Sequence, residues 1–519
     1  MTLAAACGWS LVRSLAVALA AWPICKLQVA WLSGMERRQR RLAWMALLIP
    51  FLCPELWAGY AWSGFAVRLV NTGLWNLFPF GLFSLSPQAV VARDAAVDEL
   101  LLDLLLFFRA VPVGTVAMYF APSPPLSREA WHCRKLALRV DGGNCGAGVS
   151  PALGQARRLH QKLGGYRDWL RFALYGRFYT ALPAAALMFL VAFQEFELAS
   201  LIGRPAWTVW LFDAQVGGLA LAESLRLTWL PVVCQSILLA PLLWMILTSR
   251  LNPSSRHEHT RHLSRRMRWT LWFVVIVGLT VTCVVPAILV GDGTADGLRR
   301  VLQNSVQLRM LLKEIVIGTA YALTAAAAAA LIAASLIRRA RTSRLAAMGV
   351  FGAALPGLAG SLVLSLALIH LLQCPFARFA YKTPLSLLAG LILFLLPRAM
   401  ALRLLLSSSG ASAGLHLATL LRESGALPVR DRACEVAWQM RWRGEFWSVA
   451  LLSYWVYFDL TLAYLLAPVT IVSAPVMLYN QMHFGKNAIL SALVFLTVLV
   501  PVLIFMTAAA ARRFVFRWF

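Results

Sequence analysis

The chain has 519 residues, of which 60% are hydrophobic and only 13% are charged. Soluble globular domains contain about 25% charged residues, so this composition excludes an ordinary soluble enzyme and indicates a polytopic membrane protein. The formal net charge of +26, from 48 basic and 22 acidic residues, would suggest a nucleic-acid partner in a polar chain. Here we expect basic cytoplasmic loops beside a lipid bilayer, and no nucleic acid.

Apolar runs long enough to cross a bilayer occur eleven times along the chain. A hydrocarbon core of about 30 Å takes about 20 mostly apolar residues as helix, and continuous rather than alternating hydrophobicity favours helices over a barrel. In chain order the predicted spans are 8–33, 43–66, 98–121, 178–203, 226–248, 269–291, 313–337, 345–373, 383–405, 446–472 and 488–511. The apolar stretch 71–91, which contains two prolines, is predicted to be a loop or an interfacial segment.

The basic residues are distributed unequally between the two sets of connections. Of the 48, 32 fall on the side that holds Arg37, Arg38, Arg40 and Arg41, and 11 fall on the opposite side. Lys and Arg are retained in cytoplasmic loops. The distribution therefore predicts an N-terminus outside the membrane and a C-terminus in the cytoplasm.

The two halves of the chain contain related segments. Residues 195–203 (EFELASLIG) match 459–467 (DLTLAYLLA), and 210–213 (WLFD) match 477–480 (MLYN). Further upstream, 48–62 match 351–365, and both of these helices are predicted to run from inside to outside. Repeats of the same orientation are typical of one class of transporter, so the fold class predicted is an all-α membrane protein with two parallel repeats.

The repeat divides the chain into three parts. The first repeat, 1–250, has about five helices and a polar cytoplasmic insertion near 122–152. A basic cytoplasmic linker, 251–268, leads to a second repeat, 269–519, with about six helices.

The blocks 181–203 and 452–468, each followed by an aromatic-containing motif and a last helix, resemble the membrane subunits of binding-protein-dependent ABC importers. The chain is most similar to fused permeases of the ferric iron and thiamine type, over roughly 43–250 and 313–515. The resemblance implies a solute path, with ferric iron as one solute, in a bacterial plasma (inner) membrane. It also implies two copies of a separate ABC ATPase and an extracytoplasmic solute-binding protein. The chain itself has no phosphate-binding G-x-x-x-x-G-K-[ST] loop, so we expect neither an enzyme nor a cofactor.

The family binds its ATPase through a cytoplasmic loop with Glu-Ala-Ala and a later Gly. The corresponding residues are Gln155, Ala156 and Gly164 in the first half, and Leu417, Ala418 and Gly425 in the second. Gln155 and Leu417 stand where the family has glutamate. A small residue permits close approach of a partner and Gly ends a helix, so both loops are predicted to dock the ATPase. The alternative is a solvated basic loop that lies on lipid head groups.

Ionisable residues inside membrane spans are costly and usually face a pathway or a partner. Glu195 and Asp459 correspond by repeat and, with Glu197, are predicted to flank the translocation path; alternatively, they cap helices at the outer interface in contact with water. Pro54 and Pro356 are predicted to break their helices and expose backbone to the path, or to form ordinary packing kinks. The other ionisable residues noted within spans are Glu55, Asp103 and Arg109.

Two further readings of the function remain open. A secondary transporter of the parallel-repeat kind would use Asp103, Glu195 and Asp459 as a proton relay. A membrane-embedded enzyme acting on lipid-linked substrates would need acidic or His clusters on a surface loop, whereas these loops are basic. The histidines of 257–262 lie among arginines, and Cys133 and Cys145 lack paired ligand sets, so no metal site is predicted.

Overall fold

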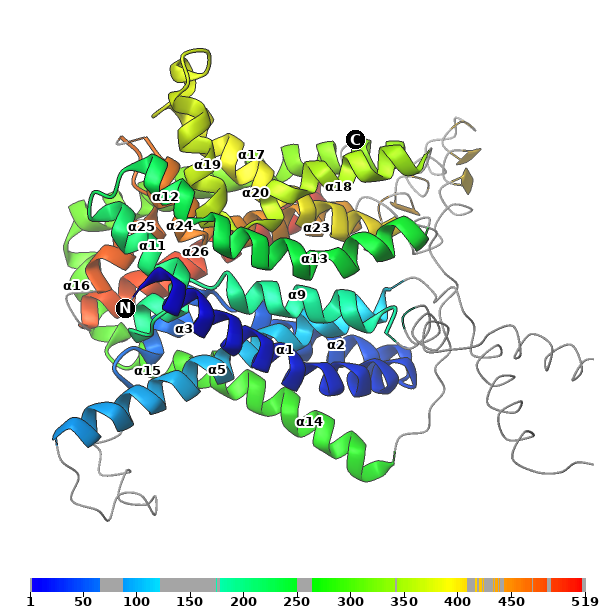
Figure 1. Ribbon diagram of the computed structural model, residues 1–519, viewed down its shortest axis with the longest axis horizontal. Coiled ribbons are helices and arrows are strands. Elements are labelled where there is room, and N and C mark those ends of the chain that lie inside the picture. The colour runs from blue at the N-terminus through cyan, green and yellow to red at the C-terminus, as the bar shows by residue number, and fades with distance from the viewer. Residues whose placement is uncertain are drawn as a thin grey trace, which may run out of the picture.

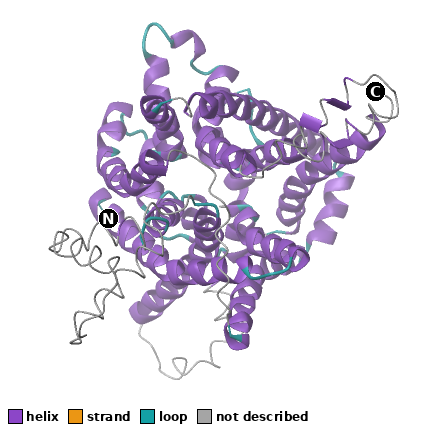
Figure 2. Ribbon diagram, turned by 90° about the vertical axis from the view of Figure 1, so that its right-hand side faces the viewer, coloured by secondary structure: helices purple, strands orange, loops and turns teal. Residues whose placement is uncertain are grey.

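The computed structural model describes residues 2–65, 87–121, 174, 178–249, 264–340, 343–407, 443–468, 470–482 and 487–515, with isolated positions between 416 and 438. Over these residues every regular element is a helix, as Figure 2 shows. Seven helices are long and apolar enough to cross a membrane, and three bent helix pairs raise the number to ten if each pair is one span. The chain is therefore a multi-pass α-helical membrane protein.

The first half of the chain runs from a long N-terminal helix to a helix that ends before the basic linker (Figure 1). Thr2 caps the first helix by accepting a hydrogen bond from the Ala5 amide at 3.3 Å. The helices are α1 (Leu3–Ser33), α2 (Arg37–Leu52), α3 (Glu55–Trp62), α5 (Pro87–Tyr119), α9 (Ala181–Phe193), α10 (Glu197–Ile202), α11 (Trp207–Val216), α12 (Leu221–Leu227) and α13 (Trp229–Ser249).

The second half opens with a helix that contains one π-helical turn, Thr280–Val284, between α14 and α15. Its helices are α14 (Arg265–Leu279), α15 (Val285–Gly291), α16 (Thr294–Gln303), α17 (Ser305–Ala340), α18 (Arg344–Leu358), α19 (Ser361–Gln373), α20 (Pro384–Ser407), α23 (Arg443–Tyr457), α24 (Leu460–Leu466), α25 (Ala474–Met482) and α26 (Ala488–Val515). A single 3₁₀ turn, Arg378–Ala380, precedes α20.

Three spans are sharply bent. The axes of α2 and α3 differ by 68°, because Cys53 adopts the extended conformation favoured before proline and Pro54 has no N–H to continue the helix. The axes of α18 and α19 differ by 100° at Gly360, whose φ of 96° only glycine adopts readily. α23 and α24 are bent by 64°; α23 ends at Tyr457, and Asp459 caps α24.

Long helices form the body of the molecule, and short helices gather at one end. α1, α5 and α9 contact one another, and α17, α20 and α23 do the same. At the end where the N-terminus lies, on the left of Figure 1, are α11, α12, α24 and α25. There α3 packs on α10, and α19 packs on α24, so the second helices of two bent spans contact other short helices.

The prediction of a helical membrane protein is confirmed, whereas the number of eleven spans stays a prediction. The predicted span 178–203 contains α9, a shorter apolar helix, followed by α10. The break expected at Pro356 is wrong, because α18 continues through it and the Ala359 amide still bonds to the Leu355 carbonyl at 3.0 Å. The predicted loop 71–91 lies outside the described residues up to 86, and α5 already begins at Pro87.

Candidate functional site

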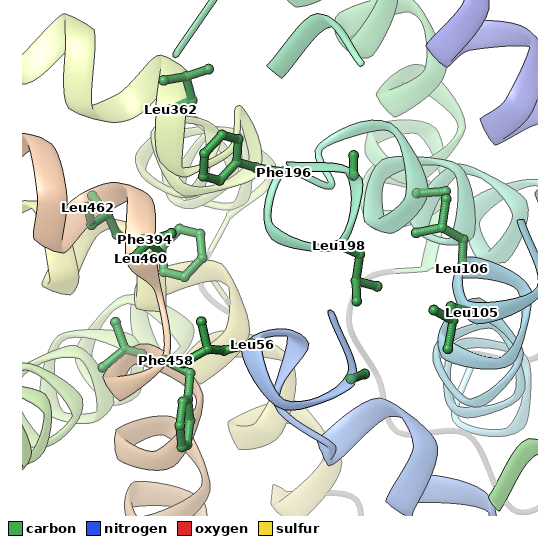
Figure 3. Close-up of a cluster of buried hydrophobic side chains, with 14 of the residues drawn as sticks. Leu56, Leu105, Leu106, Phe196, Leu198, Leu362, Phe394, Phe458, Leu460 and Leu462 are labelled. Carbon is green, nitrogen blue, oxygen red and sulfur yellow. The ribbon is translucent and has the colours of Figure 1, made fainter. Parts of the chain in front are cut away.

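The breaks of the bent spans lie close together in the interior of the described structure. In Figure 3, side chains that flank them form one buried hydrophobic cluster with Phe394 of α20. The cluster includes Leu56 of α3, Phe196 and Leu198 at the start of α10, Leu362 of α19, and Phe458, Leu460 and Leu462 around the α23–α24 break. At a break, helix-terminal N–H and C=O groups lack partners within the helix and must bond to something else. We therefore take the polar side chains that lie beside these groups as the candidate site.

Arg109 of α5 holds the break between α2 and α3. Its side chain is 6% exposed and its Nη2 forms an ion pair with the Glu55 carboxylate, which is 28% exposed. Its Nη1 donates to the Cys53 carbonyl at 2.9 Å, and the guanidinium carbon lies 5.9 Å from the centre of the Phe51 ring. One arginine thus satisfies both the last carbonyl before the break and the first carboxylate after it.

Glu195 lies in the break between α9 and α10 and is 6% exposed. Its Oε1 accepts a hydrogen bond from the Leu198 amide at 2.9 Å, which satisfies one of the open donors at the start of α10. Its backbone carbonyl accepts from the Thr208 hydroxyl at 2.6 Å. The carboxylate is within electrostatic range of Arg109. Glu195 is therefore a helix cap, as the alternative interpretation held, but it is buried in the protein.

Glu197 connects the two halves of the chain. It is 5% exposed, and its Oε1 accepts a hydrogen bond from the Leu460 amide, the first residue of α24, at 2.9 Å. Its Oε2 is buried with no hydrogen-bond partner within the described part of the chain. A carboxylate on α10 thus caps α24 across the interface. Its second oxygen can accept a proton or bind a cation.

Asp459 begins α24 in the second half as Glu195 precedes α10 in the first. Its Oδ1 accepts from the Leu462 amide at 2.9 Å. Arg398 of α20 is within electrostatic range of Asp459, donates to the Phe394 carbonyl at 2.6 Å, and lies over the Phe394 and Trp455 rings at 3.7 Å and 4.7 Å. The carboxylate therefore has a nearby cation, as Glu195 has Arg109.

The described residues at the breaks carry more negative than positive groups. Four carboxylates (Glu55, Glu195, Glu197 and Asp459) accompany two guanidiniums, Arg109 and Arg398. Unpaired charge is expensive in a membrane interior, so this excess favours a site that takes up a proton or a cation. No group of three or more His, Cys, Asp or Glu suited to a metal ion occurs in the part of the chain described.

Sequence reasoning missed two residues of this site. Arg398 interrupts the apolar run of α20, and that interruption was a signal of its role. Gln194, next to Glu195, donates from Nε2 to the Leu358 carbonyl at 2.6 Å, at the end of α18, and reaches Gln235 of α13 at 3.4 Å.

Asp103 lies apart from the breaks and pairs with Arg13 of α1 at 3.6 Å.

The predicted site residues are thus placed as follows. Glu195, Glu197, Asp459 and Pro54 meet at the breaks, whereas Pro356 lies within α18. Among the predicted docking residues, Leu417 is helical and 53% exposed. The remaining five, Gln155, Ala156, Gly164, Ala418 and Gly425, lie outside the described residues.

Comparisons with protein-family models, with curated proteins and with solved structures gave no match. The class that the fold defines is that of multi-pass helical membrane proteins, with buried ionisable groups beside breaks between helices.

Proposed function

We propose that the chain is the permease subunit of an ABC importer, with both halves of the permease fused in one polypeptide. In this proposal it forms the translocation path for a solute in a bacterial inner membrane, with the N-terminus outside and the C-terminus in the cytoplasm. Two copies of an ABC ATPase and an extracytoplasmic binding protein are its partners. Ferric iron is the solute that the sequence resemblance favours.

The observation that carries this proposal is the meeting of the helix breaks from both halves around buried carboxylates. Glu195 and Glu197 come from the first half and Asp459 from the second, and Glu197 bonds directly to α24 at 2.9 Å. Irregular backbone at membrane depth is tolerated where it is buried in protein or lines a path. Transporters use such breaks to present helix termini to a solute.

The arrangement of helices supports the proposed parallel repeat. The series α1, α2–α3, α5, α9–α10, α11 has the same order of long helices, helix pairs with a break and short helices as α17, α18–α19, α20, α23–α24, α25. Contacts follow the same order, since α3 packs on α10 and α19 packs on α24. Arg109 and Arg398 occupy corresponding helices in this scheme, α5 and α20. An axis between the halves would then pass near the buried acids.

The test is purification of the tagged full chain from its native membrane, followed by reconstitution into vesicles. We expect an ATPase subunit to co-purify at two copies per chain and ATP to drive uptake of radioactive ferric iron. The double variant Glu195→Gln with Asp459→Asn should lose uptake, while Glu223→Gln, at an exposed acid of α12, should not. Uptake by the chain alone, driven by a proton gradient without ATP, would contradict the importer.

A secondary, ion-coupled transporter is the second candidate, and the excess of carboxylates favours it. Glu197 has a buried Oε2 without a hydrogen-bond partner among the described residues, the kind of group that could take up a proton in a transport cycle. The vesicle experiment separates the two candidates. Uptake that requires ATP and persists after the proton gradient is collapsed with an ionophore supports the importer and excludes the secondary transporter.

A further inference from the structure

A pocket of about 570 Å³ lies among the short helices α10, α11, α24 and α25. Of these, α11, α24 and α25 are labelled at the left end of the molecule in Figure 1, which is the outer end in the predicted orientation. Pockets for small molecules usually measure about 300–1,000 Å³, so the volume suits a small organic solute.

Both halves of the chain contribute equivalent residues to this pocket. Asp213 ends the segment 210–213 and Asn480 ends its counterpart 477–480, and both residues line the pocket. Phe212 and Tyr479, the residues before them, line it too. The pocket therefore lies where the two proposed repeats face each other, as a site on a central path should.

Aromatic rings form much of the wall. The rings of Phe212 and Tyr464 have centroids 5.0 Å apart, and the Tyr479 hydroxyl is fixed by the Ser200 hydroxyl at 2.6 Å. Phe212 and Tyr479 are buried, whereas Asp213 is exposed. Ring faces attract cations, and Tyr464, which is only partly buried, has ring surface left to contact one. A partly exposed ring and a carboxylate in one pocket form a lining that recognises an organic cation.

The arginine in the lining does not reverse this preference. Arg204 donates from Nε to Glu99 Oε2 at 3.0 Å, and Glu99 also pairs with Arg13. Asp103 lies 3.6 Å from Arg13, so two carboxylates of α5 together offset the two guanidiniums. Pro205, next to Arg204, accepts at its carbonyl a hydrogen bond of 3.1 Å from Arg13. Through these contacts α1 and α5 hold the loop between α10 and α11 in place. Arg204 thus belongs to an ion-pair network, and Asp213 is the carboxylate among the described lining residues.

The pocket is one short helix away from the buried acids. Ser200 and Tyr464 line it, three residues after Glu197 on α10 and five after Asp459 at the start of α24. At about 1.5 Å per residue, these steps correspond to about 4.5 Å and 7.5 Å along each helix axis. A cation released from the pocket would meet the carboxylates of the helix breaks next.

We propose that this pocket binds a small organic cation, such as an amine or a quaternary ammonium compound, before it passes the helix breaks. The onward route rests on the proposed transport function, whereas binding in the pocket does not require transport. The proposal adds an organic cation to ferric iron as a candidate solute, and it assigns this pocket to the organic cation. A metal ion would need several anionic oxygen ligands, and the described lining offers one carboxylate.

The test is equilibrium binding of tetraethylammonium to the purified full chain in lipid nanodiscs, measured by calorimetry. We expect saturable binding that Asp213→Asn weakens about tenfold, which corresponds to about 1.4 kcal/mol. Tyr464→Leu should weaken it similarly, while Tyr464→Phe keeps the ring and should bind as the parent does. Asp296→Asn, at an exposed carboxylate of α16, is the matched charge control and should leave binding unchanged.

Three outcomes would overturn the proposal: no binding of tetraethylammonium, equal binding of acetate as an anionic probe, or unchanged binding in Asp213→Asn. Tighter binding of ferric citrate that competes with tetraethylammonium would overturn it as well. Failure of the proposed transport function is a separate result. In that case the chain binds tetraethylammonium with the expected dependence on Asp213. Vesicles that contain the chain and its co-purifying proteins nevertheless take up neither ferric iron nor tetraethylammonium when ATP is supplied.

Discussion

The ion pair between Arg109 and Glu55 should couple the break of α2–α3 to α5 strongly. Glu55→Gln leaves Arg109, whose side chain is 6% exposed, buried without its carboxylate. Removal of one partner of a buried pair costs about 3–5 kcal/mol. Because Glu55 is 28% exposed and Arg109 keeps its bond to the Cys53 carbonyl, we expect a loss of unfolding free energy near the lower end, about 3 kcal/mol.

A double-mutant cycle measures this coupling. The unfolding free energies of Glu55→Gln, Arg109→Met and the double variant are obtained by titrating dodecyl sulfate into detergent micelles. The double variant removes both charges of the ion pair, but it also leaves buried Glu195 without Arg109. It should therefore lose at least about 1 kcal/mol less than the sum of the two single losses, without full recovery to the parent. The exposed pair Asp296 and Arg299, 3.8 Å apart on α16 with 70% and 81% exposure, is the control and should show coupling below about 0.5 kcal/mol. Additive losses at Glu55 and Arg109 would refute the reasoning.

Two further changes test the interfaces around the site. Glu197→Leu removes the acceptor for the Leu460 amide and should lower unfolding free energy by about 1–2 kcal/mol, whereas Glu197→Gln keeps an acceptor and should lose less; equal losses would contradict the capping role. Gly297→Ala would place a Cβ 1.8 Å from the Ala488 carbonyl oxygen, so the melting temperature should fall as α16 and α26 separate. Gly349→Ala, with no atom within 4 Å, is the control and should not lower it.

Much of the architecture could be read from the sequence, because membrane insertion imposes a simple rule on composition. A bilayer requires long apolar helices, and the predicted spans overlap the candidate spans of the structure. Bends were harder to predict. Pro54 does follow the end of a helix, whereas α18 continues through Pro356 to Leu358 and the turn is made by Gly360, with its φ of 96°.

The candidate site shows the same division between local and tertiary information. The sequence alone identified Glu195, Glu197 and Asp459, since an acid in an apolar run is conspicuous at any position along the chain. It gave no sign that Glu197 bonds to Leu460, 263 residues away, or that Arg398 lies near Asp459. Such contacts depend on how α10, α20 and α24 pack, which hydrophobic periodicity does not encode.

Composition therefore determined the class of this protein, because each segment that crosses the lipid must be apolar by itself, whatever it packs against. The charge distribution predicted the orientation, because Lys and Arg are retained in cytoplasmic loops. Only the tertiary structure brought the breaks of separate spans together and formed the pocket between α10, α11, α24 and α25. Both arise where short helices from distant parts of the chain meet, and one polar terminus, the Leu460 amide, finds its partner across that interface in Glu197.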